Sequence, residues 1–506
     1  MRRTLGIFLT VTLLLAAAFG TVWTLVDSRK EQITYTENVL QGDVGAAGGI
    51  TVDTRYEYQN HLVWFSRHRP TETMKTETEF KYYVKQAQFD YEHRYTGINM
   101  NIIDTTNINW DWEVRELADD TGLEGLMKAY YDLYHGTEQG ELTNTYIRYA
   151  DYCEYYPLQI YVDGGKENYG YWDPYTKGRY GEYDENIGKI FNDYFKIPVM
   201  EDDWVQVVID KRSSGYVAES VNITNSRKGE DYCVINGCGT ATEDAIYFTF
   251  NATTNSGKPV DTSLIPGGYG LYALDQSAEG VDYSSLRTLR PLDESYYYAD
   301  MWVDEEHDLL MLHTEKENVW YLSVIDLETM ETVQEVELMV EDPDSYCWIM
   351  DQDGFLLSVI ENESISVFEQ NGDGLYEFRF TAPLPPSSIE VQADSMEDFD
   401  PDIHEGENQT FLVDNPIYNI GRYDSGYAFD GERLAVVCRL EGYQLEEGHL
   451  VWEEKNGYNL AIYTADGLVY FGEYLSSLEP LGTVEYDHRK CRLQEVTVSF
   501  APESFQ

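Results

Sequence analysis

One stretch, residues 348–381, constrains the fold of this chain more than any other, because it reads as a complete antiparallel sheet unit. Apolar residues recur through four short runs, 348–350, 355–360, 364–368 and 375–380. Asp351-Gln352-Asp353-Gly354 and Asn371-Gly372-Asp373-Gly374 separate two pairs of these runs. Short apolar runs divided by Asn, Asp and Gly are typical of strands joined by tight hairpins. The stretch therefore predicts an antiparallel meander.

The same plan occurs twice more in the chain. Trp302 precedes apolar runs at 309–312, 319–325 and 333–338, and Phe429 precedes runs at 434–437, 460–463 and 468–471. Val303 and Met350 are 47 residues apart, and the 79 residues from Met350 to Phe429 include an acidic, Pro-rich insertion of about 39. Without that insertion the spacing is about 40 residues, close to the ~40 to 50 of a four-stranded propeller blade. Further strand-like runs lie at 205–209, 245–250 and 269–274.

The units at Trp302, Trp348 and Phe429 resemble blades of the β-propeller superfamily. None of the three units carries both the Gly-His and the Trp-Asp pair of WD40 repeats, so the resemblance is to the superfamily and to no single family. It implies a mostly β disc of about seven blades, within a range of six to eight, whose loops or central channel bind ligands. A strand at 489–500 that pairs with a sheet beginning near 52–65 would close such a ring. The alternative fold is a set of stacked β-sandwich domains.

The N-terminus predicts a membrane anchor. Arg2 and Arg3 precede an uncharged run of 23 residues, 4–26, which exceeds the ~20 that a helix needs to cross a bilayer. The two arginines favour the cytoplasmic side. We therefore assign 1–27 to a transmembrane signal-anchor, 28–50 to a juxtamembrane segment, and 51–506 to a cell-surface, extracytoplasmic propeller-like ectodomain with insertions near 110–200 and 383–421. The alternative is a signal peptide cleaved near the small residues 16–20, which would give a secreted protein.

The charge of the chain excludes one class of partner. Asp and Glu number 91 against 35 Lys and Arg, which gives a formal net charge of −56. Phosphate backbones would be repelled, so nucleic acid is not an expected partner. Six cysteines are too few to define a disulfide scaffold in 506 residues. Cys347 and Cys438 lie in apolar runs and are expected to be buried thiols, whereas Cys233 and Cys238 could close a hairpin in an oxidising compartment.

A tyrosine-rich excursion is the predicted binding region. Twelve tyrosines and one tryptophan lie between residues 146 and 194, among several glycines. Aromatic faces on a long loop could bind sugar rings or a peptide. The alternative is that they pack the excursion onto the sheet below. A helix at 123–134, preceded by a shorter one at 113–117, is expected to use its apolar stripe for packing. The candidate ligand-binding residues are Tyr169, Tyr171, Trp172, Tyr175, Tyr180 and Tyr183.

Catalytic and metal-binding motifs are not found. The sequence contains no Gly-x-Ser-x-Gly, no His-Glu-x-x-His and no phosphate-binding lysine loop. Six residues separate His307 from His313, about 20 Å along a strand, which is too far for one metal. The run 369–380 resembles a partial calcium loop, but Phe380 stands where a bidentate Glu is needed. We therefore predict no catalytic residue, metal or cofactor.

Three functions remain open. The first is a membrane-anchored binding or sensing protein without catalytic activity, whose ligand is a carbohydrate or a protein. The second is a carbohydrate-active enzyme on the same scaffold, which would need two carboxyls ~5 to 10 Å apart in an aromatic pocket. The third is an assembly factor for envelope proteins, which a large exposed apolar patch would favour.

Overall fold

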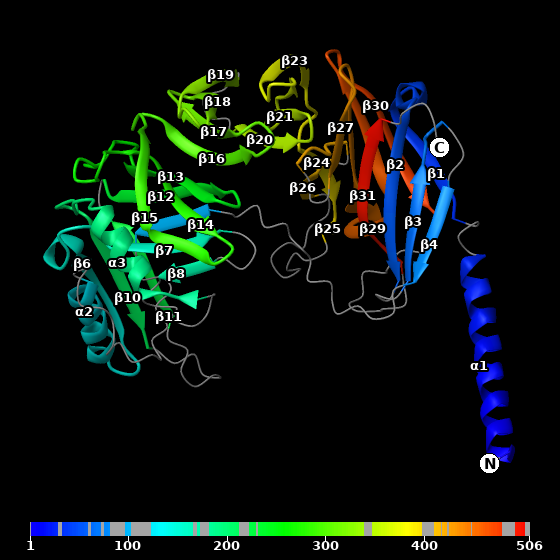
Figure 1. The fold of residues 1–506 in the computed structure, drawn as a ribbon, viewed down its shortest axis with the longest axis horizontal. Coiled ribbons are helices and arrows are strands. Elements are labelled where there is room, and N and C mark those ends of the chain that lie inside the picture. The colour runs from blue at the N-terminus through cyan, green and yellow to red at the C-terminus, as the bar shows by residue number, and fades with distance from the viewer. Residues whose placement is uncertain are drawn as a thin grey trace. The chain divides into compact units, whose positions relative to one another are not determined.

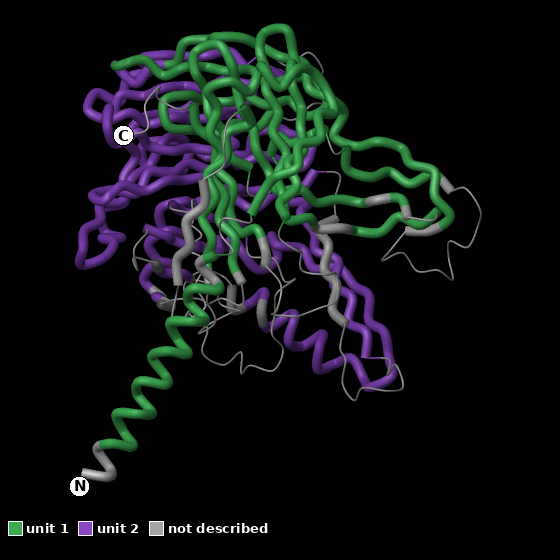
Figure 2. The backbone as a smooth tube through the Cα atoms, turned by 90° about the vertical axis from the view of Figure 1, so that its right-hand side faces the viewer, with its two compact units in different colours: residues 1–89, 344–372, 376–506 green, residues 90–343, 373–375 purple. Residues whose placement is uncertain are grey.

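The structure, a computed structural model of the full chain, consists mostly of β-strands, with an apolar helix at the N-terminus (Figure 1). The fold class is confirmed at that level. The structure describes residues 2–28, 33–58, 62–71, 75–80, 97–102, 123–164, 169–172, 182–211, 222–228, 231–338, 347–396, 409–415, 417–421, 425–446, 448–477 and 491–500. The chain divides into two compact units (Figure 2). Unit 1 comprises residues 1–89, 344–372 and 376–506, and unit 2 comprises residues 90–343 and 373–375.

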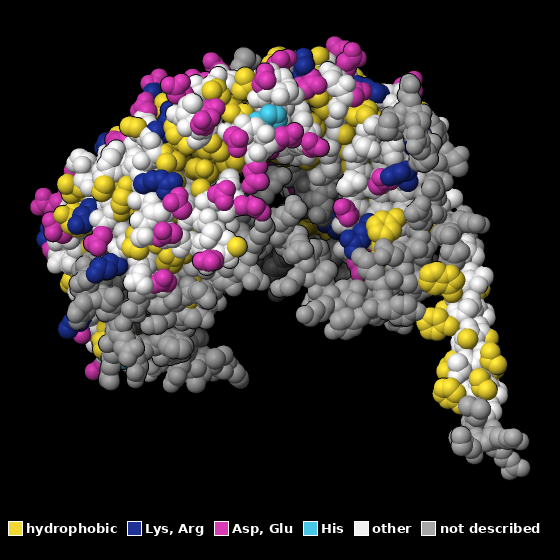
Figure 3. Space-filling view, in the orientation of Figure 1, with side chains coloured by type: hydrophobic (Ala, Val, Ile, Leu, Met, Phe, Trp, Pro, Cys, Tyr) yellow, Lys and Arg dark blue, Asp and Glu magenta, His cyan; other side chains and the backbone are white. Residues whose placement is uncertain are grey.

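Helix α1 (Arg2–Asp27) exposes its apolar side chains. Leu13 is 68% exposed and Phe8 is 67% exposed, and Figure 3 shows hydrophobic side chains along the helix. The 20 residues Gly6–Leu25 have a mean hydropathy of 2.0. This segment is long and apolar enough to cross a bilayer, as a membrane anchor or a signal sequence would be.

Three larger sheets form most of unit 1. Sheet I has the strand order β31-β2-β3-β4, sheet II has the order β1-β30-β29-β28-β27, and sheet III has the order β20-β21-β22-β23. The strands of sheets I and II are β1 (Tyr35–Gly42), β2 (Ile50–Tyr58), β3 (Leu62–His68), β4 (Lys75–Phe80), β27 (Gly426–Phe429), β28 (Leu434–Glu446), β29 (His449–Thr464), β30 (Gly467–Ser476) and β31 (Cys491–Phe500). Those of sheet III are β20 (Cys347–Gln352), β21 (Phe355–Ile360), β22 (Ser364–Gln370) and β23 (Tyr376–Pro383).

The first and last strands of the folded body pair with each other. β31 runs antiparallel to β2, with Ile50 opposite Phe500 and Tyr58 opposite Cys491. The predicted pairing of a C-terminal strand with the sheet that begins near residues 52–65 is thus confirmed. β1 lies in the predicted juxtamembrane segment, yet it is a full strand of sheet II and pairs with β30.

Sheet II lies between sheets I and III, and this explains its sequence. Leu434 and Val436 of β28 pack into one core with residues of sheet III. Ala435 and Val437 pack into a second core with Ile50 and other residues of sheet I. Successive residues of a strand point to opposite faces, so a strand covered on both faces has a continuous apolar run instead of an alternating one.

The described residues of unit 2 form four sheets and two longer helices around one core. Sheet IV has the order β5-β7-β8-β9, sheet V β11-β10-β6, sheet VI β12-β13-β14-β15 and sheet VII β16-β17-β18-β19. The elements are β5 (Gly97–Ile102), α2 (Leu123–Gly136), β6 (Leu142–Arg148), β7 (Leu158–Asp163), β8 (Tyr169–Trp172), β9 (Glu182–Tyr183), α3 (Glu185–Tyr194), β10 (Trp204–Asp210), β11 (Asn222–Lys228), β12 (Cys233–Ala241), β13 (Ala245–Thr254), β14 (Gly270–Ser277), β15 (Gly280–Pro291), β16 (Tyr297–Asp304), β17 (Leu309–Lys316), β18 (Val319–Asp326) and β19 (Thr332–Leu338). Short 3-10 turns occupy Val44–Ala47 in unit 1 and Tyr149–Asp151 in unit 2.

Glycines allow two strands of unit 2 to approach closely. Gly97 on β5 has φ +137°, and a Cβ there would lie 2.4 Å from the carbonyl carbon of Gly239. A Cβ on Gly239 would lie 2.8 Å from the backbone nitrogen of Ile98. Both distances are too short for a Cβ atom. The backbones of β5 and β12 can therefore lie this close only because both residues are glycine.

The three predicted meanders each form a sheet of their own: sheet VII after Trp302, sheet III after Trp348 and sheet II after Phe429. The strand runs at 205–209, 245–250 and 269–274 fall on β10, β13 and β14. The helix at 123–134 is α2, which buries Leu126 and Tyr130 completely. The shorter helix at 113–117 lies outside the described residues.

The acidic insertion contains strands that its composition does not predict: β24 (Ser388–Ala393) pairs with β26 (Gln409–Asp414), and β25 (Ser395–Met396) pairs in parallel with β29. Phe411 and Val413 bury one face of this small sheet against Leu450. The hairpin disulfide is not formed: Cys233 and Cys238 are free thiols on one strand. Five residues along a strand span about 16 Å, which exceeds the reach of a disulfide.

Candidate functional site

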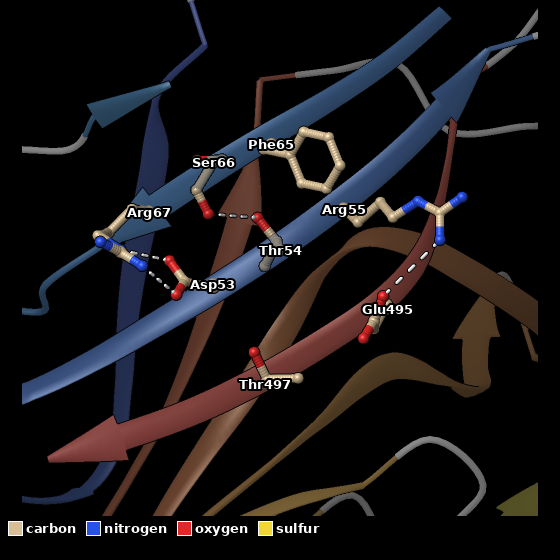
Figure 4. Close-up of a pocket in the computed structure, with 8 residues that line it drawn as sticks. All are labelled: Asp53, Thr54, Arg55, Phe65, Ser66, Arg67, Glu495 and Thr497. Carbon is tan, nitrogen blue, oxygen red and sulfur yellow. Dashed lines mark hydrogen bonds and ion pairs between the residues drawn. The ribbon is translucent and has the colours of Figure 1, made fainter. Parts of the chain in front are cut away.

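The candidate site is a groove on the exposed face of sheet I (Figure 4). Alternation along β2 points Asp53 and Arg55 to this face, whereas Thr54 and Tyr56 point inward and are buried. The register brings side chains from three strands together. Arg55 lies opposite Phe65 of β3 and Glu495 of β31. Asp53 lies opposite Arg67 and Thr497 in the next row.

The groove encloses a cavity of about 380 Å³. Its lining is mainly polar and charged, with one aromatic ring. The lining residues are Asp53, Thr54, Arg55, Phe65, Ser66, Arg67, Glu495 and Thr497.

The two arginines of the groove differ in how fully they are bound. The Nε and Nη2 atoms of Arg67 each donate a hydrogen bond of 2.7 Å to a carboxylate oxygen of Asp53. This two-point pair is partly exposed, so it contributes little stability, but it fixes the orientation of both side chains. Arg55 has a much looser partner, because its Nη1 lies 3.8 Å from the Glu495 carboxylate. Its Nε is buried and has no hydrogen-bond partner among the described residues.

Phe65 supplies an exposed apolar surface between these charges. Its side chain is 39% exposed, and it projects from a strand bordered by β2 and β4. An aromatic ring held on a paired strand presents a fixed face to a ligand. The groove therefore combines one ring face with two carboxylates, two guanidinium groups and the Thr497 hydroxyl.

A buried group of aromatic side chains, which we name the Tyr–His cluster, lies beneath the floor of the groove. Its members are Tyr35, Tyr56, His68, Tyr458, Tyr470 and Tyr474. The Tyr35 hydroxyl forms hydrogen bonds with Thr54 Oγ1 at 2.8 Å and with the Tyr56 hydroxyl at 2.7 Å. Thr54 Oγ1 also donates to the carbonyl of Ser66. Since Thr54 and Ser66 line the groove, the cluster fixes its floor.

Hydrogen bonds and burial keep the Tyr–His cluster uncharged. The His68 ring stacks on Tyr35, with centroids 5.0 Å apart, and its Nδ1 is hydrogen-bonded to the Tyr458 hydroxyl. Burial lowers the pKa of His68 to about 4, against the opposing effect of the Glu37 charge. Burial also raises the pKa of Tyr458 well above its usual value. Tyr470 and Tyr474 both donate to Glu37 Oε1, which attaches β1 to the cluster.

The predicted tyrosine site lies in unit 2, whereas the groove lies in unit 1. Tyr171 is buried, with 2% exposure, and stacks on Tyr161 with ring centroids 6.0 Å apart. Its ring therefore packs the sheet, as the alternative reading expected. Tyr169, Trp172 and Tyr183 lie on β8 and β9, but their side chains are outside the described residues. Tyr175 and Tyr180 are entirely outside them, so binding by this set stays a prediction.

The two histidines and the partial calcium loop contact neighbours within their own units. His307 lies in a turn and its Nδ1 is hydrogen-bonded to Asp304 at 2.7 Å, whereas His313 is buried on β17 beside Trp320. Glu369 of the partial calcium loop pairs with Arg379. Within the described residues, no three His, Cys, Asp or Glu side chains are grouped to hold a metal ion.

Sequence reasoning missed the groove. Charged residues alternate at 53, 55 and 57, which predicts only an exposed strand face. Only the pairing of β2 with β31 indicates the groove, because it places Glu495 beside Arg55 although the two are 440 residues apart.

Comparisons with known proteins identify no family. No family model matches the chain, and no curated protein matches it in sequence. One solved structure, the crystal structure of a functionally unknown protein from Desulfotomaculum acetoxidans DSM 771, aligns with 57% of this chain and 96% of its own. The aligned residues are 8% identical and the TM-score is 0.20, so this likeness carries no argument about fold or function.

Proposed function

We propose that this protein is a membrane-anchored, extracytoplasmic binding protein without catalytic activity, and that the groove of sheet I binds a carbohydrate. The observation that carries the proposal is the exposed Phe65 ring, set among paired charged side chains on one sheet face. Sugar rings stack their C–H faces on aromatic rings and use their hydroxyls to bond carboxylate and guanidinium groups. A cavity of about 380 Å³ falls within the ~300 to 1,000 Å³ of small-molecule sites.

The carboxylates of the groove favour binding over hydrolysis. A glycosidase needs one carboxyl that keeps its proton in order to donate it to the leaving group. Asp53 accepts two hydrogen bonds from Arg67, and Glu495 faces Arg55. Both oxygens of Asp53 are therefore engaged by Arg67 rather than directed at a ligand.

For the body we propose a β-propeller of about seven blades, within a range of six to eight. The support is that six of the described sheets, I–IV, VI and VII, each contain a run of four neighbouring strands. Sheet I takes its fourth strand, β31, from the end of the chain, as propellers that close their ring do. Small-angle scattering from a compact, flat particle would agree with this proposal, and an elongated particle would contradict it.

For the location we propose that α1 is retained and that residues after about 28 lie outside the cytoplasm, with Arg2 and Arg3 inside. Protease added to intact cells should remove the body and leave a short anchored fragment. Release of an intact soluble body whose first residue falls within 16–28 would instead indicate a cleaved signal peptide.

A glycan array probed with the full chain in nanodiscs tests the binding function. We expect Phe65→Ala to weaken binding at least about tenfold, because the stacking face is lost, and Phe65→Trp to retain it. The matched control is Phe378→Ala, since Phe378 is 58% exposed on β23 and lies next to the paired Arg379. Thermal unfolding of each variant separates lost binding from lost folding. Binding to no glycan, or equal binding by Phe65→Ala and the unaltered chain, would contradict the proposal.

A further inference from the structure

We infer that the carbohydrate bound in the groove is acidic, and that Arg55 recognises its carboxylate or sulfate group. This inference depends on the proposed binding function and specifies the ligand of the same groove. The two arginines of the groove differ in their hydrogen bonds. Two N–H groups of Arg67 donate hydrogen bonds to the Asp53 carboxylate in a planar pair. Arg55 has a single carboxylate contact, at 3.8 Å, and a buried Nε without an acceptor among the described residues.

The position of Arg55 suits an anion carried on a stacked sugar. Arg55 lies directly opposite Phe65 in the strand register, and neighbouring strands are about 5 Å apart. A sugar ring on the face of Phe65 would therefore place an attached carboxylate or sulfate within reach of the guanidinium. Two oxygens of such a group match two N–H groups of arginine in one plane.

Glu495 is a weak competitor for this interaction. Its side chain is 59% exposed and that of Arg55 is 30% exposed, so their contact is screened by water and is weak. A ligand anion that forms two charge-assisted hydrogen bonds would displace it.

The charges of the groove favour a short-range contact between Arg55 and an anion. Its two arginines balance Asp53 and Glu495, whereas the whole chain carries a formal charge of −56. The groove is thus neutral on a strongly acidic protein, and an anion there meets a cation at contact distance while the long-range field opposes its approach. Short acidic oligosaccharides fit this arrangement better than long polyanions.

Two matched pairs of probes test the inference on the full chain in nanodiscs of neutral lipid. The first pair is trigalacturonic acid and its methyl ester, and the second is sulfated and unsulfated maltotriose. We expect at least one acidic probe to bind about tenfold more tightly than its neutral partner. The pair that shows the difference tells a carboxylate ligand from a sulfate ligand.

Variants assign the preference to Arg55. Arg55→Gln should remove the preference for the acidic probe, so that the acidic and neutral probes of a pair bind equally. Arg55→Lys should restore part of it, since lysine is charged but lacks the planar fork. Glu495→Gln should tighten acidic binding a few-fold by removing the competitor. Arg379→Gln is the control, because Arg379 is a partly exposed arginine paired with Glu369 on sheet III.

The outcomes distinguish the two proposals. Equal binding of acidic and neutral probes, or a preference that survives Arg55→Gln, would overturn the inference and leave carbohydrate binding intact. Failure of all four probes to bind would count against both proposals.

Discussion

Burial of the His313 imidazole lowers its pKa to about 4. Its Nε2 has no hydrogen-bond partner among the described residues, and its ring lies over Trp320 with centroids 4.7 Å apart. In the unfolded chain a histidine has its usual pKa near ~6.5. Between pH 6.5 and 4 the unfolded state therefore binds a proton that the folded state does not. The contribution of the uncharged His313 to the stability of unit 2 is fully present above about pH 6.5 and is lost as the pH falls towards 4.

Replacing this histidine should reduce the acid sensitivity of unit 2. In His313→Phe the aromatic stack can remain while the titrating group is removed. Between pH 7 and pH 5, proton binding by His313 in the unfolded chain lowers the free energy of unfolding by about 2 kcal/mol. We therefore expect the decrease in melting temperature over this range to be about 4 °C smaller in the variant than in the unaltered chain. Calorimetry at both pH values measures the difference. His135→Asn, at the exposed end of α2, is the control for the loss of a histidine from the same unit.

Tyr35, like Glu37, holds β1 to the interior of unit 1; its hydroxyl is hydrogen-bonded to Thr54 and Tyr56. Tyr35→Phe leaves these two buried hydroxyls without that partner, and such a loss costs about 1 to 3 kcal/mol. We expect faster hydrogen exchange at the amides of β1 and β30, which pair with each other. Asn38→Ala removes only an exposed bond to Glu473 and should leave exchange nearly unchanged. Equal exchange in Tyr35→Phe and the unaltered chain would show that the Tyr35 hydroxyl is not needed to hold β1.

Among the structural elements, β5 and β12 depend most directly on residue size. Gly239→Ala would put a Cβ 2.8 Å from the Ile98 nitrogen and 3.0 Å from the Tyr247 oxygen. Backbone atoms cannot move aside as a side chain can, so we expect unit 2 to lose about 2 kcal/mol. Gly136→Ala is the matched control in the same unit, because a Cβ there has no neighbour within 4 Å. Chemical denaturation measures both, and similar midpoints would contradict the prediction.

The sequence predicts elements well where one physical signal dominates. The apolar runs at 309–312 and 355–360 identify strands that the structure buries, and the stripe containing Leu126 and Tyr130 identifies α2. Helix α3 was not predicted, because its ten residues lie in a region dominated by tyrosine and glycine signals. β24 and β26 were missed since acidic and Pro-rich composition favours an extended loop, while burial of Phe411 against Leu450 depends on tertiary contacts.

The groove could not be predicted for a different reason. Local sequence patterns do not show which distant strands pair. Arg55 and Glu495 are 440 residues apart, and the residues around each of them do not indicate that they are partners. The tyrosine-rich excursion had the stronger local signal. Its one described candidate side chain, Tyr171, is buried, so aromatic abundance there reflects packing at least in part.

On the scale of the whole molecule, the two units have separate cores. Removing residues 491–506 deletes β31 and leaves β2 without its partner from Ile50 to Tyr58. We expect unit 1 to unfold at a lower temperature while the transition of unit 2 is unchanged. Removing only residues 501–506, which follow β31, is the control. Calorimetry combined with hydrogen exchange assigns each transition, and a single shared transition in every variant would contradict the separation.

The pairing of β31 with β2 also sets a condition on biosynthesis. The strand that completes sheet I begins 433 residues after β2 ends, and at ~5 to 20 residues per second the ribosome needs roughly 20 to 90 s to make that length. Throughout this time the nascent chain exposes an unpaired strand edge, which is a hazard for aggregation. A chain exported during translation would thus finish sheet I only after its last residues had crossed the membrane, and would depend on chaperones on the far side until then.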